Sequence, residues 1–200
     1  MNDCLRIPLL ATALLATALL LTACSDGEPW RTRDISGLMP ELEFRLIDDR
    51  GRQVTADAFD GRVNLLYFGF THCPDICPAT LGKLVRARSE LPDELGDEAR
   101  ILFVSVDPQR DDPESLRTWT GYFGDDVIGL TGDRDALDAL TRRYRVTYGY
   151  GEETEPGRYD VSHSSAVFVF DPEGEARLLL RKDDPVAAIS ADLERLLREG

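Results

Sequence analysis

The sequence feature that most constrains the fold is an apolar run that leads directly into a pair of cysteines. Residues 64–70 read NLLYFGF, the length and composition of a strand covered on both faces of a sheet. Cys73 and Cys77 follow at once, in the sequence THCPDICP at 71–78. Open α/β sheets place their ligand sites just beyond the carboxyl ends of such strands. We therefore expect a buried central strand that delivers two thiols to a functional edge of the sheet.

Helices and strands alternate after the cysteine pair. Leucines at helical spacing beyond Pro78 predict a helix, and the apolar run ILFVSV at 101–106 predicts a second buried strand. Residues 113–122 begin with proline and predict another helix, and Thr131 or Asp133 is expected to cap a third. This order is typical of an α/β domain.

Two hairpins and a last helix complete the expected domain. One N-terminal hairpin precedes the central strand, with strands at 42–47 and 53–55 around a turn at 49–51. The other hairpin pairs 167–170 with 176–180, and residues 185–198 predict the final helix. A chain of 200 residues has room for one such domain with a sizeable core.

The N-terminal residues predict an export signal. Residues 7–23 carry no charge, Arg6 precedes them, and small residues lead to Cys24. The sequence LTAC at 21–24 resembles the bacterial lipobox, which implies cleavage before Cys24 and lipidation of that cysteine. We predict a signal peptide at 1–23, a tether at 24–37 and the folded domain at 38–200. The expected product is lipid-anchored to a membrane and faces the periplasm of a bacterial cell envelope, with a spanning anchor as the alternative.

The charge of the chain restricts its partners. Lysine and arginine total 23 against 37 aspartates and glutamates, which gives a formal net charge of -14. The electrostatic field of this negative charge repels the phosphate backbone of nucleic acids unless a strong local basic patch opposes it. We therefore do not expect nucleic acid as a partner.

Cys73 and Cys77 are the only thiols expected to remain in the exported domain, where the compartment is oxidising. Side chains four positions apart on a helix have β-carbons about 5–6 Å apart, wider than the roughly 3.8 Å of a relaxed disulfide. Two thiolates on one soft metal tolerate the wider separation, so the spacing favours a metal site over a structural disulfide. A helix start also lowers thiol pKa, which suits both metal binding and redox exchange.

The chain holds two histidines that could complete a metal site. His72 is adjacent to Cys73, and the side chains of adjacent residues usually point apart. His163 comes just before the apolar run at 167–170 and follows a glycine-rich stretch, which predicts a loop able to carry it to the thiols. Two sulfurs and one imidazole suit copper(I) or zinc, and an envelope compartment favours copper.

Three segments together resemble the Sco/SenC family of copper chaperones. They are YFGFTHCPDICP at 67–78, VDPQRDDP at 106–113 and SHSSAVFVFDPEG at 162–174, in the order the family has them. The resemblance covers roughly residues 38–197 and implies a thioredoxin-like domain that binds copper through Cys73, Cys77 and His163. Asp107 matches the family's acidic residue near the metal and is a candidate to orient a ligand. The family often has Asp-His-Ser where this chain has SHS at 162–164.

The resemblance implies a metallochaperone with no catalytic residues, which delivers copper to the copper-bearing subunit of cytochrome oxidase. Copper donors and thiol reductants would be its further partners. The alternative is a periplasmic thiol-disulfide oxidoreductase that uses Cys73 and Cys77 without transferring copper. A combined role is also open, because the cysteines of a recipient copper site must be reduced before they bind metal. Three residues between the cysteines, and no proline between Pro156 and Pro172, depart from an ordinary thioredoxin.

Overall fold

The computed structural model describes residues 28–199. The predicted signal peptide and Cys24 lie outside these residues. Within them, no helix combines the length and the apolar character needed to cross a membrane. The chain from Arg31 onward forms one compact unit.

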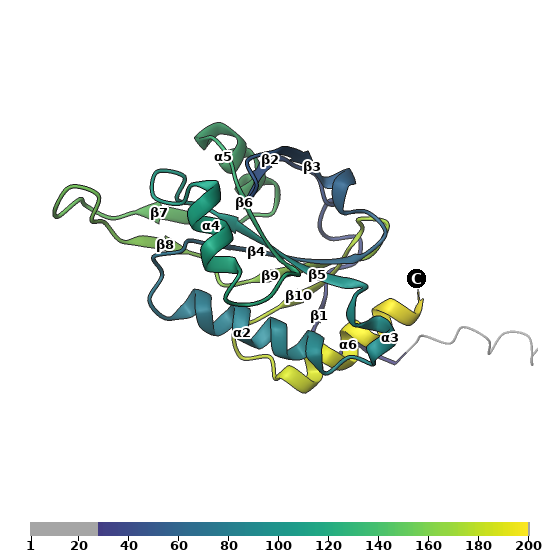
Figure 1. Ribbon diagram of the computed structural model, residues 1–200. Coiled ribbons are helices and arrows are strands. Elements are labelled where there is room, and N and C mark those ends of the chain that lie inside the picture. The colour runs from purple at the N-terminus through teal and green to yellow at the C-terminus, as the bar shows by residue number, and fades with distance from the viewer. Residues whose placement is uncertain (1–27, 200) are drawn as a thin grey trace, which may run out of the picture. The chain divides into compact units, whose positions relative to one another are not determined.

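The unit is built on one sheet with the strand order β1-β10-β9-β4-β5-β6-β2-β3 (Figure 1). The strands β4, β5 and β6 run parallel, and the remaining pairs are antiparallel. Their bounds are β1 (Arg33–Asp34), β2 (Arg45–Asp48), β3 (Gln53–Thr55), β4 (Val63–Gly69), β5 (Ala99–Ser105), β6 (Val127–Thr131), β9 (Val167–Phe170) and β10 (Ala176–Leu180). Both predicted hairpins are therefore confirmed, as β2–β3 and as β9–β10.

The central strand β4 lies between β5 and β9, and all seven of its residues are buried. Its side chains alternate between the two faces of the sheet. Leu66 and Phe68 lie on one face and belong to a core cluster that also contains Leu137 of the helix at residues 134–143. Tyr67 and Gly69 point to the opposite face, toward the cysteines. The apolar run at 64–70 thus forms the doubly covered strand that its composition predicts.

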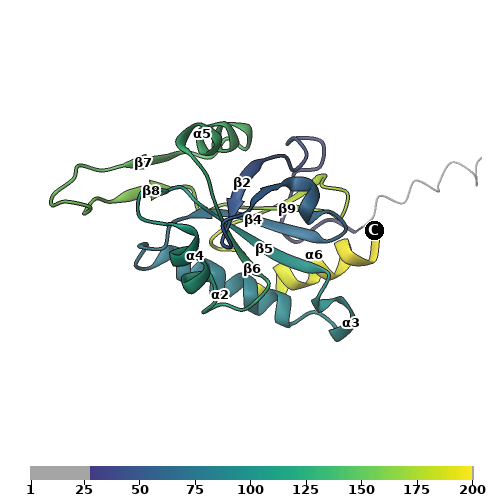
Figure 2. The same cartoon turned by 45° about the horizontal axis from the view of Figure 1, so that its top comes forward.

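Helices cover both faces of the sheet. They are η2 (Ala56–Phe59, a 3-10 turn), α2 (Ile76–Ser89), α3 (Asp93–Gly96), α4 (Pro113–Thr120), α5 (Arg134–Arg143) and α6 (Val186–Glu199). Figure 2 shows α2, α4 and α6 on one side of the sheet and α5 on the other. Of the two predicted caps for α5, the structure uses Asp133, whose carboxylate accepts a hydrogen bond from the Ala136 N–H at 2.8 Å.

The residues from 31 to 37, expected to belong to a tether, are packed into the compact unit. Arg33–Asp34 forms β1 and pairs with β10 at the sheet edge. The Thr32 N–H and hydroxyl both donate to the Asp192 carboxylate of α6, at 2.7 Å each. The boundary expected at residue 38 therefore falls inside the unit.

The segment between α5 and β9 forms an antiparallel ribbon rather than the predicted open loop. Its strands are β7 (Tyr148–Tyr150) and β8 (Val161–His163), with His163 paired to Tyr148. The ribbon extends outward from the body of the domain (Figure 1). His163 is therefore held by strand pairing at the base of the ribbon, which is a firmer support than a glycine-rich loop.

Candidate metal centre

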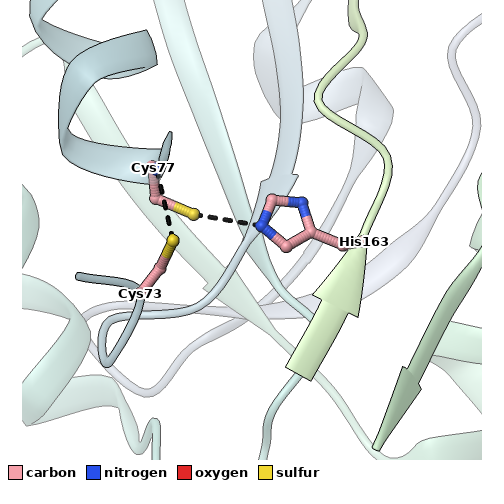
Figure 3. Close-up of side chains that lie close together, drawn as sticks. All are labelled: Cys73, Cys77 and His163. Atoms are coloured by element: carbon pink, nitrogen blue, oxygen red, sulfur yellow. Dashed lines mark hydrogen bonds between the residues drawn. The ribbon is translucent and has the colours of Figure 1, made fainter. Parts of the chain in front are cut away.

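The structure brings together the three side chains that the sequence analysis selected. The Sγ atoms of Cys73 and Cys77 and a ring nitrogen of His163 all lie within 4.8 Å of one another (Figure 3). Cys77 and His163 are 86 positions apart in the chain, and the Cys77 Sγ is 3.3 Å from the His163 Nε2. The fold, rather than local spacing, creates this group of donors.

The two cysteines meet by a turn and not by a shared helix face. Helix α2 begins at Ile76, so Cys77 lies in its first turn and Cys73 precedes it. The Cys77 N–H, one of the donors that a helix start leaves without an internal partner, donates to the Cys73 Sγ at 3.3 Å. The stretch between the cysteines is therefore not helical before Ile76, and the β-carbon separation of a helical i, i+4 pair does not apply, although the sulfurs do come together.

The Cys77 thiol is fully buried. Burial raises its pKa to about 12, which outweighs the backbone hydrogen bond that acts in the opposite direction. The expectation that the helix start would lower the thiol pKa is therefore wrong for Cys77. Because metal binding requires the thiolate, uptake of a metal must release this proton. Cys73 is half-buried and gives the site its access to solvent.

The His163 ring is oriented by its own neighbour in the chain. Its Nδ1 lies 2.9 Å from the Ser164 carbonyl oxygen. A carbonyl only accepts, so Nδ1 carries the hydrogen and Nε2 turns its lone pair to the thiols. Burial lowers the pKa of His163, which favours the neutral ring that a metal needs. The ring packs edge-on against Phe70, with centroids 5.8 Å apart.

Ser162 stands where the related family often has an aspartate, and it does not take over a supporting role. Its hydroxyl is exposed and donates to the Gly149 carbonyl at 3.4 Å, within the ribbon. The carbonyl of Ser164 supplies the hydrogen bond that a carboxylate gives to many metal-binding histidines. The departure at position 162 therefore leaves the orientation of His163 intact.

His72 points away from the thiols, as its adjacency to Cys73 predicts. Its side chain is 55% exposed, and its Nδ1 lies 3.1 Å from the Thr71 hydroxyl and 3.5 Å from the Asp111 carboxylate. Of the two histidines, only His163, at the end of β8, lies close to both sulfurs.

Asp107, the candidate for orienting a ligand, has other partners. Its buried carboxylate accepts hydrogen bonds from the Arg110 Nε and the Tyr159 hydroxyl, at 2.5 Å each. The Arg110 guanidinium also stacks on the Tyr159 ring, 3.8 Å from its centroid. Since Tyr159 belongs to the β7–β8 segment, Asp107 ties the ribbon to the end of β5. It supports His163 through the ribbon and does not contact it directly.

Asp111 is a site residue that sequence reasoning missed. Its buried carboxylate accepts hydrogen bonds from the Thr71 N–H at 2.8 Å, the Thr71 hydroxyl at 2.6 Å and the Ser105 hydroxyl at 2.6 Å. These contacts fasten the loop that carries Cys73 to the end of β5. Asp111 belongs to the segment VDPQRDDP at 106–113, which the sequence analysis singled out. Nothing in that segment distinguishes Asp111 from the other aspartates.

Asp111→Ala is expected to loosen the cysteine loop. The change leaves the Thr71 N–H and the Ser105 hydroxyl buried without an acceptor, which costs about 2 kcal/mol of folding free energy. Urea unfolding of the purified protein measures this loss. Asp112→Ala is the matched control, because Asp112 is exposed and only caps α4, where a lost cap costs about 1 kcal/mol. Equal stability of the two variants would contradict the role assigned to Asp111.

The donor set suits a soft metal ion. Bonds of about 2.3 Å to sulfur and 2.0 Å to nitrogen place three donors around one ion roughly 4 Å apart. Donor atoms that already lie within 4.8 Å need only small side-chain rotations to reach that arrangement. Two thiolates and one imidazole favour copper(I) or zinc over the oxygen-seeking calcium and magnesium.

Comparison with known proteins agrees with this geometry. The model of the SCO1/SenC family matches residues 37–198. The human mitochondrial SCO2 homolog is 41% identical over 133 residues, which are 66% of this chain and 50% of that protein. The chain thus spans about half the length of this relative, as it does for the mitochondrial SCO2 of Saccharomyces cerevisiae.

Solved structures show the same fold. Arabidopsis thaliana ScoI with copper bound has a TM-score of 0.74 and 35% identity, over 80% of this chain and 99% of its own. Yeast Sco1 with copper bound also has a TM-score of 0.74, with 30% identity over 81% of this chain and 90% of its own. These similarities confirm the predicted α/β fold with a central sheet.

Proposed function

Since the chain belongs to the SCO1/SenC family, we propose that it binds copper through Cys73, Cys77 and His163 and delivers it to the copper-bearing subunit of cytochrome oxidase. The observation that carries this proposal is the convergence of two thiols and one imidazole within 4.8 Å. Similarity to structures of Sco proteins with copper bound supports the choice of metal.

The three ligands have different parts in holding and releasing the metal. Cys77 is the buried donor, at the start of α2, and His163 is half-buried and oriented by the Ser164 carbonyl. Cys73 is half-buried, so a thiol of a recipient can reach the metal from its side. Two thiolates and one copper(I) leave a net charge of about -1 in a partly buried site, which nearby hydrogen-bond donors must stabilise. Transfer then proceeds by exchange of ligands, without covalent turnover.

The location and the other partners are also part of the proposal. Residues 1–23 would act as an export signal and Cys24 would carry lipid, so that the domain faces the periplasm from a bacterial membrane. Copper donor proteins and thiol reductants of that compartment would load and reduce the site. The net charge of -14 argues against nucleic acid as a partner.

His163→Ala tests the three-ligand site. We expect the copper(I) affinity to fall roughly a hundredfold, because the soft metal loses one of three donors. The exchange of Cys73 and Cys77 with a small disulfide should be largely unchanged, since both thiols remain. Competition with a chromogenic copper(I) chelator gives the affinity, and release of a coloured thiol gives the exchange rate.

His72→Ala is the matched control for this experiment. His72 is the other histidine of the chain and lies beside Cys73, but its ring faces Thr71 and Asp111. Its removal should leave the copper affinity within a few-fold of the original protein. If His163→Ala bound copper as tightly as His72→Ala, the site would not be the one proposed.

Thiol-disulfide exchange is a second candidate function, favoured by the two free thiols and the accessibility of Cys73. The Cys73 thiolate would attack a disulfide of the partner, forming a mixed disulfide and releasing one partner thiolate. Cys77 would then displace the second partner thiolate and close the Cys73–Cys77 disulfide, so the partner gains two electrons. The raised pKa of Cys77 suits it to this second step, after contact with the mixed disulfide, better than to the first attack.

A further inference from the structure

Tyr67 is a fully buried tyrosine next to the candidate metal centre. It lies on β4 between Phe103 of β5 and Val167 of β9, and its ring centroid is 5.9 Å from Phe103 and 6.1 Å from His163. None of its surface is exposed. Its hydroxyl lies close to the Cys77 sulfur and the Thr80 hydroxyl, but it makes no hydrogen bond of good geometry to any of the described residues. A phenylalanine would fill the same space without burying a polar atom.

The Tyr67 hydroxyl faces the cysteine helix. Tyr67 and Gly69 share one face of β4, and a Cβ atom on Gly69 would lie only 2.8 Å from the Cys77 Sγ. The sulfur therefore rests on the strand two residues beyond Tyr67. Burial is the main cause that raises the pKa of Tyr67, and the proximity of the Cys77 and Cys73 sulfurs raises it further. The Thr80 hydroxyl, one helical turn beyond Cys77, is the other polar neighbour.

A buried hydroxyl without a partner destabilises a fold, so its presence here requires a physical reason. The Cys77 sulfur lies close to this hydroxyl, and its charge changes when it binds a metal. As a thiol it is a weak acceptor, but as a metal-bound thiolate it is a strong one. Figure 3 shows this sulfur directed to His163 from the start of α2.

We propose that the Tyr67 hydroxyl donates a hydrogen bond to the Cys77 sulfur when that sulfur is bound to copper. This inference rests on the proposed function, and it makes Tyr67 a positioning residue that acts through Cys77. The hydrogen bond offsets part of the negative charge that two thiolates bring into a buried site. It also lowers the energy of the sulfur electrons, as donors around the sulfur do in other copper sites.

Tyr67→Phe tests the proposal, because it removes only the hydroxyl. Without metal, the melting temperature should be unchanged or higher, since a buried unpaired polar atom is lost. With copper, the affinity should fall about tenfold to a hundredfold, the range for groups that support metal ligands. In the copper(II) form, the sulfur-to-copper absorption band should move to longer wavelength. Copper(I) with a competing chelator gives the affinity, and calorimetry gives both melting temperatures.

Tyr144→Phe is the matched control. Tyr144 is also fully buried, but its hydroxyl already donates to the Glu41 carbonyl at 2.7 Å and accepts from the Glu43 N–H at 3.0 Å. Its loss should lower the melting temperature and leave copper affinity and absorption unchanged. The two variants therefore have opposite expected signatures.

The outcomes separate the inference from the proposed function. If the original protein binds no copper, both fail. If it binds copper and Tyr67→Phe matches it in affinity and absorption, the proposed function stands and the inference is overturned. A further outcome is that Tyr67→Phe and Thr80→Val both lower the stability without copper, with neither variant moving the sulfur-to-copper absorption band. In that case the Tyr67 hydroxyl is hydrogen-bonded to Thr80, and the inference is overturned. A weaker affinity with a moved band, at undiminished stability without metal, supports it.

Discussion

Cys77→Ser is expected to abolish tight copper binding while the domain remains folded. A hydroxyl is a poor ligand for a soft metal, and the one remaining thiolate with His163 should lower copper(I) affinity by at least about a thousandfold. The serine hydroxyl can still donate to the His163 Nε2, as the thiol does now. The smaller atom leaves a minor void, so the fold should persist. Elemental analysis after chelator treatment should find copper in the original protein and none in the variant.

Cys73→Ser is the companion variant. Its comparison with Cys77→Ser shows which of the two cysteines is buried in the site and which one solvent can reach. Both variants lose a sulfur ligand and should release copper. Because Cys73 is half-buried and Cys77 is buried, alkylation of the folded protein should label Cys77→Ser readily and Cys73→Ser slowly. Retention of one tightly bound copper ion by Cys77→Ser would place the metal elsewhere and contradict the proposed site.

The sequence predicted the parts of this molecule that depend on local patterns. The run at 64–70 is apolar throughout, and β4 is buried throughout. Asp133 precedes a run with leucines at helical spacing, and it caps α5. The choice of His163 rested on ligand chemistry and on the resemblance to a family, because no local rule relates it to a cysteine 86 positions away.

The parts that were missed depend on contacts between distant segments. Asp111 is buried because Thr71 and Ser105 present donors to it, and neither contact is visible in sequence. Tyr67 is indistinguishable from any core aromatic until its hydroxyl is placed beside the thiols. Strand β6 (Val127–Thr131) contains Gly129, which weakens a strand pattern, and its pairing with β5 overrides that weak local preference.

Gly69→Ala is expected to damage both the fold and the site. Gly69 ends β4, and an added Cβ atom would lie 2.6 Å from the Phe103 Cε2 and 2.8 Å from the Cys77 Sγ. Phe103 cannot retreat easily, because it packs between Tyr67 and Trp119 at centroid distances of 5.9 and 4.8 Å. Overpacking of a filled core costs about 3 kcal/mol. Urea unfolding should show this loss.

The same methyl group would push the Cys77 sulfur away from the sheet, so the copper affinity of Gly69→Ala should fall beyond what its stability alone explains. Gly82→Ala is the matched control: this glycine lies in α2, and an added Cβ there meets no atom within 4 Å. Alanine in a helix is about 0.5–1 kcal/mol more favourable than glycine, so this variant should be more stable than the original protein and bind copper as well. Equal copper affinities of the two variants would show that the close approach of Cys77 to the strand does not determine the geometry of the site.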